Sequence, residues 1–181
     1  MYKVDKLQTV IKCNSVIADT CSAVHEKWFQ HKDSTWTYDK YNIFSAASPV
    51  PQFHSFYKEF KFKIQEWLPN EKRLWFQAWL NYHEQDKVLD WHNHYWPYHG
   101  YICIDPKDTV TEFKDKTGEA TVPAEWEIKN EVGQIYFGPG HKEHRVVVKS
   151  DYTGPRITIG FDIVNESNKD VFNSWSFFPL V

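Results

Sequence analysis

The sequence predicts a mainly β protein, a sandwich or a barrel, with helices at its N-terminal end. About eight short apolar segments follow one another after residue 73, separated by Gly, Pro, Asn and Asp, as strands do in sandwiches and barrels. Before residue 70, by contrast, apolar residues recur at helical spacing. Aromatic residues make up 18% of the chain, and such large rings fill the space between packed sheets well.

The N-terminal part is predicted to hold a short strand over 6–12 and then a helix. Asn14 or Ser15 can cap this helix, which we expect to run to about His31. Its apolar residues recur at helical spacing and are Val16, Cys21, Val24 and Trp28.

A second helix is expected over 52–68, after an irregular or partly extended stretch at 35–48. Ser48-Pro49 suits a helix start, and Pro69-Asn70 suits its end. The apolar face of this helix consists of Phe53, Phe56, Tyr57, Phe60, Ile64 and Trp67. Both helices should pack on one outer face of the β region.

The β region is predicted to begin with a hairpin, because a polar turn at 83–87 separates two apolar runs. The strand candidates are 74–82, 88–92, 100–104, 109–113, 124–128, 134–137, 145–149 and 156–164. We expect one domain over 1–181, with helical support in 1–70, a barrel core in 71–165 and a tail in 166–181. The apolar residues of 172–181 should dock on the helices or the sheet.

Composition excludes several classes of function. The chain has 181 residues, enough to bury a core without cross-links. Its net charge is −3 and it lacks a run of five basic residues, which argues against nucleic acid as a partner. Three cysteines without a Cys-x-x-Cys pair suggest neither a disulfide framework nor a thiolate zinc site, and fit a reducing compartment. No apolar signal core or run of roughly 18 apolar residues is present, so we expect a soluble cytoplasmic protein without a membrane partner.

The motif with most chemical meaning is His92-Asn93-His94. In an extended strand, side chains two apart share a face, so these two imidazoles can reach one metal ion. The pair alone could also be two hydrogen-bonded surface histidines. A third ligand should come from the turn-rich segment 138–146, which carries His141 and His144 before an apolar strand.

Further motifs follow in order: Gln134 to Pro139, then His144-Arg145-Val146, then Arg156-Ile157-Thr158. This ordered set over 79–164 resembles the iron(II)- and 2-oxoglutarate-dependent oxygenases. It is most similar to small prolyl-hydroxylase-like members with His-x-His followed by a Gly and an aromatic strand, here Gly100-Tyr101. The resemblance implies a double-stranded β-helix, a jelly-roll or cupin-like barrel.

The resemblance also implies a role for single residues. His92, His94 and His144 would bind iron(II), and Arg156 would bind the far carboxylate of 2-oxoglutarate with the Thr158 hydroxyl beside it. Arg156 and Thr158 share a strand face, and a guanidinium fork matches a carboxylate. Two residues on flanking strands could bond the near end of the co-substrate, namely Asn81 and Tyr101.

The motif departs from the family because position 94 is His where the usual triad has a carboxylate. An arrangement of Asp90, His92 and His144 supported by His94 therefore stays open. His141 is the rival of His144, which we prefer because it directly precedes the strand at Val146. We interpret His83 and His99 as ordinary loop histidines. Trp79, Trp91 and Trp96 could line a substrate mouth or fill the core.

The activity implied is hydroxylation of a protein side chain or a small metabolite, with release of succinate and CO2 from 2-oxoglutarate. Oxygenases that repair nucleobases carry a second arginine six residues after the first, and here that residue is Asp162. Nucleic acid is therefore not the expected substrate. Two other classes stay open: a non-catalytic sugar-binding jelly roll, and a three-histidine cupin-type dioxygenase that needs no 2-oxoglutarate.

Overall fold

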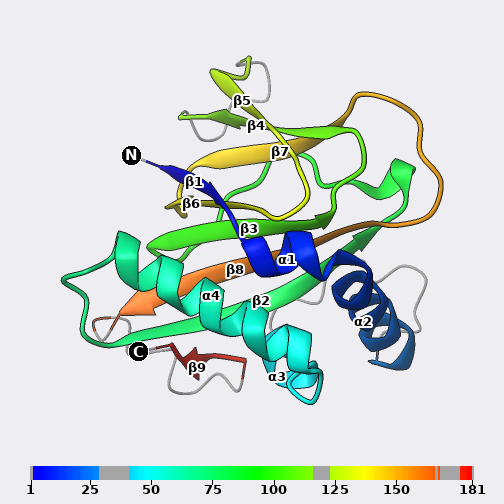
Figure 1. Cartoon of the computed structure of the whole chain (residues 1–181). Coiled ribbons are helices and arrows are strands. Elements are labelled where there is room, and N and C mark those ends of the chain that lie inside the picture. The colour runs from blue at the N-terminus through cyan, green and yellow to red at the C-terminus, as the bar shows by residue number, and fades with distance from the viewer. Residues whose placement is uncertain (1, 29–40, 116–122, 166, 168–175, 181) are drawn as a thin grey trace.

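Two antiparallel sheets form the β region (Figure 1) of a computed structural model that describes residues 2–28, 41–115, 123–165, 167 and 176–180. The larger sheet has six described strands, in the order β1 (Lys3–Lys6), β6 (Gln134–Pro139), β3 (Tyr98–Asp105), β8 (Arg156–Asn165), β2 (Leu74–His83) and β9 (Phe178–Pro179). The smaller sheet has three, in the order β5 (Trp126–Lys129), β4 (Thr109–Lys114) and β7 (Glu143–Val148). The predicted mainly β fold with N-terminal helices is confirmed, and the paired sheets match the double-stranded β-helix.

The helices cover one face of the larger sheet (Figure 1). They are α1 (Gln8–Lys12), α2 (Asn14–Trp28), α3 (Ile43–Ala46) and α4 (Pro51–Trp67), with a short 3-10 turn η1 at Gln85–Lys87. Phe56 and Phe60 of α4 are fully buried against sheet residues such as Phe161. Burial of each such ring stabilises the fold by about 1.5–3 kcal/mol.

The alternation of side chains along the strands separates an apolar face from a polar one. In β8, Ile157, Ile159, Phe161 and Ile163 belong to the core under the helices. The residues between them point to the other face and are Arg156, Thr158, Gly160 and Asp162. The smaller sheet covers part of this second face, where Phe113 of β4 packs on Tyr101 and Tyr136. The polar side chains between the two sheets come from this face.

The start of the chain differs from the prediction. The strand predicted at 6–12 is wrong: β1 spans Lys3–Lys6, and Gln8–Lys12 form α1. The reason lies in α4, where the Glu59 carboxylate accepts hydrogen bonds from the backbone N–H groups of Gln8 and Thr9 at 2.6 and 2.7 Å. Those N–H groups have no partner within a helix, so a carboxylate there favours a helix start.

The predicted helices are confirmed where the structure describes them, as α2 to Trp28 and as α4; residues 29–31 lie outside the described part. Part of the stretch expected to be irregular forms α3, because the Asn42 side chain accepts a hydrogen bond from Phe44 N–H at 3.1 Å and caps it. Residues 35–40 are again outside the described part.

The hairpin predicted between 74–82 and 88–92 is wrong. β2 pairs with β8 along its whole length, and β9 pairs with its other edge only at Trp75 and Phe76. The segment 89–94 instead runs beside β7, where Val146 N–H donates to the Leu89 carbonyl at 3.0 Å. This pairing brings the His-x-His segment next to the predicted distal histidine.

The described part of the C-terminal tail docks on the sheet, as predicted: β9 pairs with β2, and Leu180 is buried. Residues 172–175 and 181 lie outside the described part. Within the described chain, none of the helices has the length and apolar character needed to cross a bilayer.

Candidate metal centre

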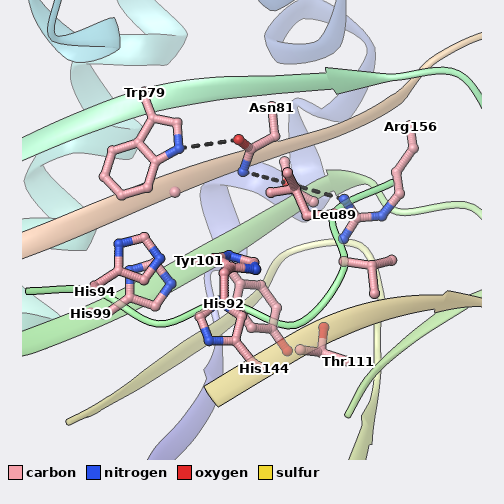
Figure 2. A pocket seen from close by; sticks show the side chains of 13 residues that line it. Trp79, Asn81, Leu89, His92, His94, His99, Tyr101, Thr111, His144 and Arg156 are labelled. Carbon is pink, nitrogen blue, oxygen red and sulfur yellow. Dashed lines mark hydrogen bonds between the residues drawn. The ribbon is translucent and has the colours of Figure 1, made fainter. Parts of the chain in front are cut away.

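Four imidazoles lie together between the two sheets (Figure 2): His92, His94, His99 and His144. The ring centroids of His92 and His144 are 4.2 Å apart, and those of His94 and His99 are 3.5 Å apart with nearly parallel planes. His99 and His144 are 4.9 Å apart. His94, His99 and His144 are buried and His92 is half-buried. Such a cluster of basic rings is typical of a metal site.

Backbone pairing places these rings. His92 and His144 exchange two backbone hydrogen bonds of 3.0 and 2.9 Å, and His94 N–H donates to the Gly140 carbonyl at 2.8 Å. His99 lies in β3 directly opposite Asp162 of β8. Segments far apart in the sequence therefore converge because their strands are neighbours in the sheets.

Hydrogen bonds define which nitrogen of each predicted ligand is available. His92 Nδ1 lies 2.7 Å from the Asp90 carbonyl, and His144 Nδ1 lies 3.1 Å from the Lys142 carbonyl. A carbonyl only accepts, so both Nδ1 atoms carry hydrogen and both Nε2 atoms keep a lone pair. His94 Nδ1 lies 3.3 Å from Asp162 Oδ1, which favours the same tautomer. The three Nε2 atoms are then the candidate ligand atoms.

The environment keeps His92, His99 and His144 neutral, the state in which imidazole binds a metal. Burial lowers the pKa of His92 to about 4 and that of His99 to about 3. Burial also lowers the pKa of His144 well below its usual range, and the neighbouring imidazoles lower it further. A second proton on any of these rings would be both desolvated and close to other rings.

These shifts predict that the metal-free protein loses stability as the pH falls from about 6.5 towards 4. The unfolded chain takes up protons on His92 and His99 near the ordinary pKa of 6.5, whereas the folded protein does so only near 4 and 3. Each histidine should reduce the free energy of unfolding by about 1.4 kcal/mol per pH unit in that window.

Urea unfolding at pH 7 and pH 5, with a chelator present, measures this loss. His99→Gln removes one of the buried histidines and should make the loss smaller than in the wild type. An equal free energy of unfolding at both pH values would contradict the neutral cluster.

Asp162 is the buried carboxylate of the cluster. Its Oδ1 lies 3.0 Å from His99 Nδ1 and 3.3 Å from His94 Nδ1, and its Oδ2 accepts a hydrogen bond from Gln77 Nε2 at 2.9 Å. Burial raises the pKa of Asp162, but the hydrogen bonds to His94 and His99 outweigh it and lower the pKa to about 2. The carboxylate therefore stays ionised and orients two imidazoles at once.

Two groups of three described side chains have ligand atoms within 4.8 Å of one another. One consists of His92, His94 and His144, and the other of His94, His99 and Asp162. The structure thus brings together the three residues predicted as ligands, and it adds a buried His/His/Asp group that shares His94. The sequence motif indicated neither His99 nor Asp162 as part of the site.

The structure does not favour the two alternative metal ligands, Asp90 and His141. Asp90 is exposed and its carboxylate accepts the Trp91 N–H at 2.8 Å, while His141 is exposed. The interpretation of His99 as a loop histidine is wrong, because it lies buried within β3. His83 is no loop residue either: it ends β2 and is fully buried.

The far end of the same cavity holds Arg156 (Figure 2). Its side chain is 2% exposed and donates 3.4 Å hydrogen bonds to the hydroxyls of Thr109 and Thr158. No described Asp or Glu forms an ion pair with it, and burial lowers the pKa of the guanidinium. A group with five donors is thus buried with two long hydrogen bonds to neutral oxygens.

Asn81 and Tyr101, predicted to bond the co-substrate, also line the cavity. The Asn81 amide accepts a hydrogen bond from Trp79 Nε1 at 3.1 Å and donates one to Thr158 at 3.3 Å. Burial raises the pKa of Tyr101 well above its usual value, so its hydroxyl keeps its proton.

The cavity between the two ends is narrow, with a volume of about 30 Å³. Trp79 forms one wall, lying over Gly160, where a Cβ would come within 2.6 Å of the indole ring. Two other tryptophans considered for a substrate mouth lie elsewhere: Trp91 packs under Lys114 and Arg145, and Trp96 packs on Phe177.

Comparison with known proteins finds likeness only among solved structures. No protein-family model matches the sequence, and no curated protein matches it. A cupin-2 domain protein from Shewanella frigidimarina NCIMB 400 superposes with a TM-score of 0.32 at 19% identity, over 48% of this chain and 69% of that chain.

Two enzymes superpose comparably. Hydroxypropylphosphonic acid epoxidase from S. wedmorenis gives a TM-score of 0.33 at 13% identity, over 49% of this chain and 42% of that one. The non-heme alpha-ketoglutarate-dependent epimerase SnoN from nogalamycin biosynthesis gives 0.38 at 12% identity, over 68% and 56%. Likeness at this level concerns the fold, and function must be argued from the site.

Proposed function

We propose that this protein is a non-haem iron(II) oxygenase that uses 2-oxoglutarate, with His92, His94 and His144 as metal ligands and Arg156 as the co-substrate anchor. The observation that carries the proposal is a single cavity with a cluster of imidazoles at one end and a buried guanidinium at the other. A divalent metal ion suits the first end and a carboxylate suits the second.

The donor set fits a divalent transition metal. Three neutral imidazoles suit iron, zinc and copper, and each ring is oriented by an acceptor on its other nitrogen. Those acceptors are the Asp90 carbonyl for His92, the Lys142 carbonyl for His144 and the Asp162 carboxylate for His94. The carboxylate of the usual triad would thus act from behind a ligand, where it raises the basicity of the ring.

The guanidinium fits an anion. Burying a charge without a partner is costly, and two long hydrogen bonds to hydroxyls offset little of that cost. A carboxylate can accept two parallel N–H groups of Arg156, with the Thr158 hydroxyl as a further donor. The Tyr101 hydroxyl and the Asn81 amide would then face the end of the co-substrate nearer the metal.

When bound, iron(II) would supply oxygen activation coupled to decarboxylation of 2-oxoglutarate to succinate and CO2. The chain's own part is to hold the ligands, anchor the dicarboxylate and exclude water behind Trp79. The outcome is hydroxylation of a protein side chain or a small metabolite. The net charge of −3 disfavours nucleic acid as substrate.

Anaerobic titration of the protein with iron(II) and then with 2-oxoglutarate tests the proposal. The expected result is one iron per chain and a visible charge-transfer band that appears on addition of 2-oxoglutarate. Absence of iron binding would instead favour the sugar-binding jelly roll and contradict the metal centre.

The second candidate is a three-histidine dioxygenase that does not use 2-oxoglutarate. It is favoured by the all-imidazole group and by the narrow cavity of about 30 Å³, which leaves little room for a five-carbon dicarboxylate. Iron binding without any response to 2-oxoglutarate would identify this class.

The wall residue between the two ends gives a separate prediction. Leu89 is half-buried and lines the same cavity as Arg156 (Figure 2). Leu89→Ala should strengthen 2-oxoglutarate binding and leave iron affinity unchanged, because it adds room without touching a ligand. Leu68→Ala, which shortens a half-buried leucine after α4, is the control. Weaker 2-oxoglutarate binding in Leu89→Ala would show that Leu89 packs against the co-substrate.

A further inference from the structure

A chain of buried polar side chains leads from the imidazoles to the C-terminal segment. Gln77 Nε2 donates to Asp162 Oδ2 at 2.9 Å, and Ser176 Oγ donates to Gln77 Oε1 at 3.1 Å. The Ser176 carbonyl in turn accepts a hydrogen bond from Asn42 Nδ2 at 3.4 Å. Asp162 and Ser176 are fully buried, and Gln77 and Asn42 are at most 2% exposed.

These hydrogen bonds all run in the same direction, from donor to acceptor towards Asp162, so each bond depends on the next. An ionised carboxylate only accepts, so Gln77 must turn its amide nitrogen to Asp162 and its oxygen to Ser176. The Ser176 hydroxyl is then the donor that holds the amide in this orientation. With Oδ2 held by Gln77, Asp162 presents Oδ1 to His94 and His99.

Strand pairing also connects the C-terminal segment with Asp162, through β2. Gln77 lies opposite Asp162 in the β2–β8 pair, while β9 pairs with the other edge of β2. Leu180 N–H donates to the Leu74 carbonyl at 2.7 Å, which seats the segment that carries Ser176. Docking of 176–180 therefore sets the position of the Ser176 hydroxyl.

We infer that Gln77 and Ser176 are positioning residues that act through Asp162 on His94 and His99, and that they couple docking of the C-terminal segment 176–180 to metal binding. The inference rests on the metal centre of the proposed function, and it adds residues from outside the cavity. Coupling of this kind is reciprocal. Metal binding should stabilise the docked segment by the same factor by which docking strengthens metal binding.

The first test uses manganese(II) as the probe and a pair of variants with nearly the same shape. Ser176→Thr keeps a hydroxyl and Ser176→Val does not, so a merely structural role would affect both alike. We expect Ser176→Thr to bind manganese more tightly than Ser176→Val. Gln77→Met should lose about 10–100-fold in affinity, as is typical for groups that orient a metal ligand.

Non-additivity provides the internal control. In Gln77→Met the hydroxyl has lost its route to Asp162, so adding Ser176→Val should weaken manganese binding little further. Asn130→Leu removes another buried amide, one that bonds Thr109 and Thr111 and not the imidazoles. It should leave manganese affinity unchanged. Equal affinities in Ser176→Thr and Ser176→Val, or fully additive losses, would overturn the inference.

Two further measurements separate this inference from the proposed function. In the metal-free protein, the Nδ1–H resonances of His94 and His99 should shift in Gln77→Met, whether or not the wild type binds iron. In the wild type, manganese should slow hydrogen exchange of the Leu180 amide at least several-fold. Unchanged imidazole resonances, or exchange that manganese does not alter, would overturn the coupling even if the metal centre itself is established.

Discussion

Replacing His92 or His144 by alanine should abolish iron(II) binding. Each residue supplies one of three candidate ligand atoms that lie within 4.8 Å of one another, and loss of a ligand should exceed the about 10–100-fold loss typical of an orienting partner. The metal content of purified protein and an anaerobic iron(II) titration measure the effect. His141→Ala is the matched control, because this exposed histidine in the same turn-rich segment is outside both groups.

The same experiment distinguishes between the two groups that share His94. If His92, His94 and His144 bind the metal, His99→Ala and Asp162→Asn should weaken binding but not remove it. The reverse pattern, with binding lost in His99→Ala and Asp162→Asn but kept in His92→Ala and His144→Ala, would assign the metal to the His/His/Asp group. Equal iron content in the wild type and all variants would exclude a metal centre here.

The sequence predicts the strands well because their apolar runs are long and bounded by turn residues. Each strand predicted from residue 100 onward has a counterpart in β3 to β8, within a few residues at each end. The two-residue period also predicts correctly that Arg156 and Thr158 share a face. These are local properties of a chain segment, which is why one sequence suffices.

Pairing between distant segments is not a local property, and the errors occur there. The segment 88–92 follows β2 after a polar turn, as a hairpin partner does, yet β2 pairs with β8 and residues 89–94 lie beside β7. The helix α1 replaces a predicted strand because of Glu59, which lies about fifty residues further along the chain. Neither effect can be predicted from the segment itself, because each depends on residues far away in the sequence.

Pairing between distant segments also explains why the sequence did not indicate the carboxylate of the cluster, Asp162. Asp162 lies six residues after Arg156, an even spacing that places it on the same strand face, so its direction could be predicted. Its contact with His99 depends on the β3–β8 register, which places the two residues opposite each other. His99 itself lies between Pro97 and Gly100, and such neighbours favour a loop over a strand.

Arg156→Ala should remove 2-oxoglutarate binding at ordinary concentrations while iron stays bound. Losing a desolvated, charge-assisted pair between guanidinium and carboxylate costs about 2–5 kcal/mol, which corresponds to about thirty-fold or more in affinity. Arg156→Lys should recover only part of this, because an ammonium group lacks the fork. A surface ion pair with Asp151 or Asp162, worth at most about 1 kcal/mol, is not what the structure shows, since the side chain is 2% exposed.

Calorimetric titration of 2-oxoglutarate into the manganese-loaded protein measures the effect without turnover. Arg145→Ala is the control, because this partly exposed arginine pairs with Glu112 and does not line the cavity. Thr158→Val keeps the shape of the Thr158 side chain and removes its hydroxyl, so its loss in affinity should be smaller than that of Arg156→Ala. If Arg156→Ala binds 2-oxoglutarate as tightly as the wild type, the guanidinium does not anchor it. The imidazole cluster would then support the three-histidine dioxygenase, and the buried cation would need another anion.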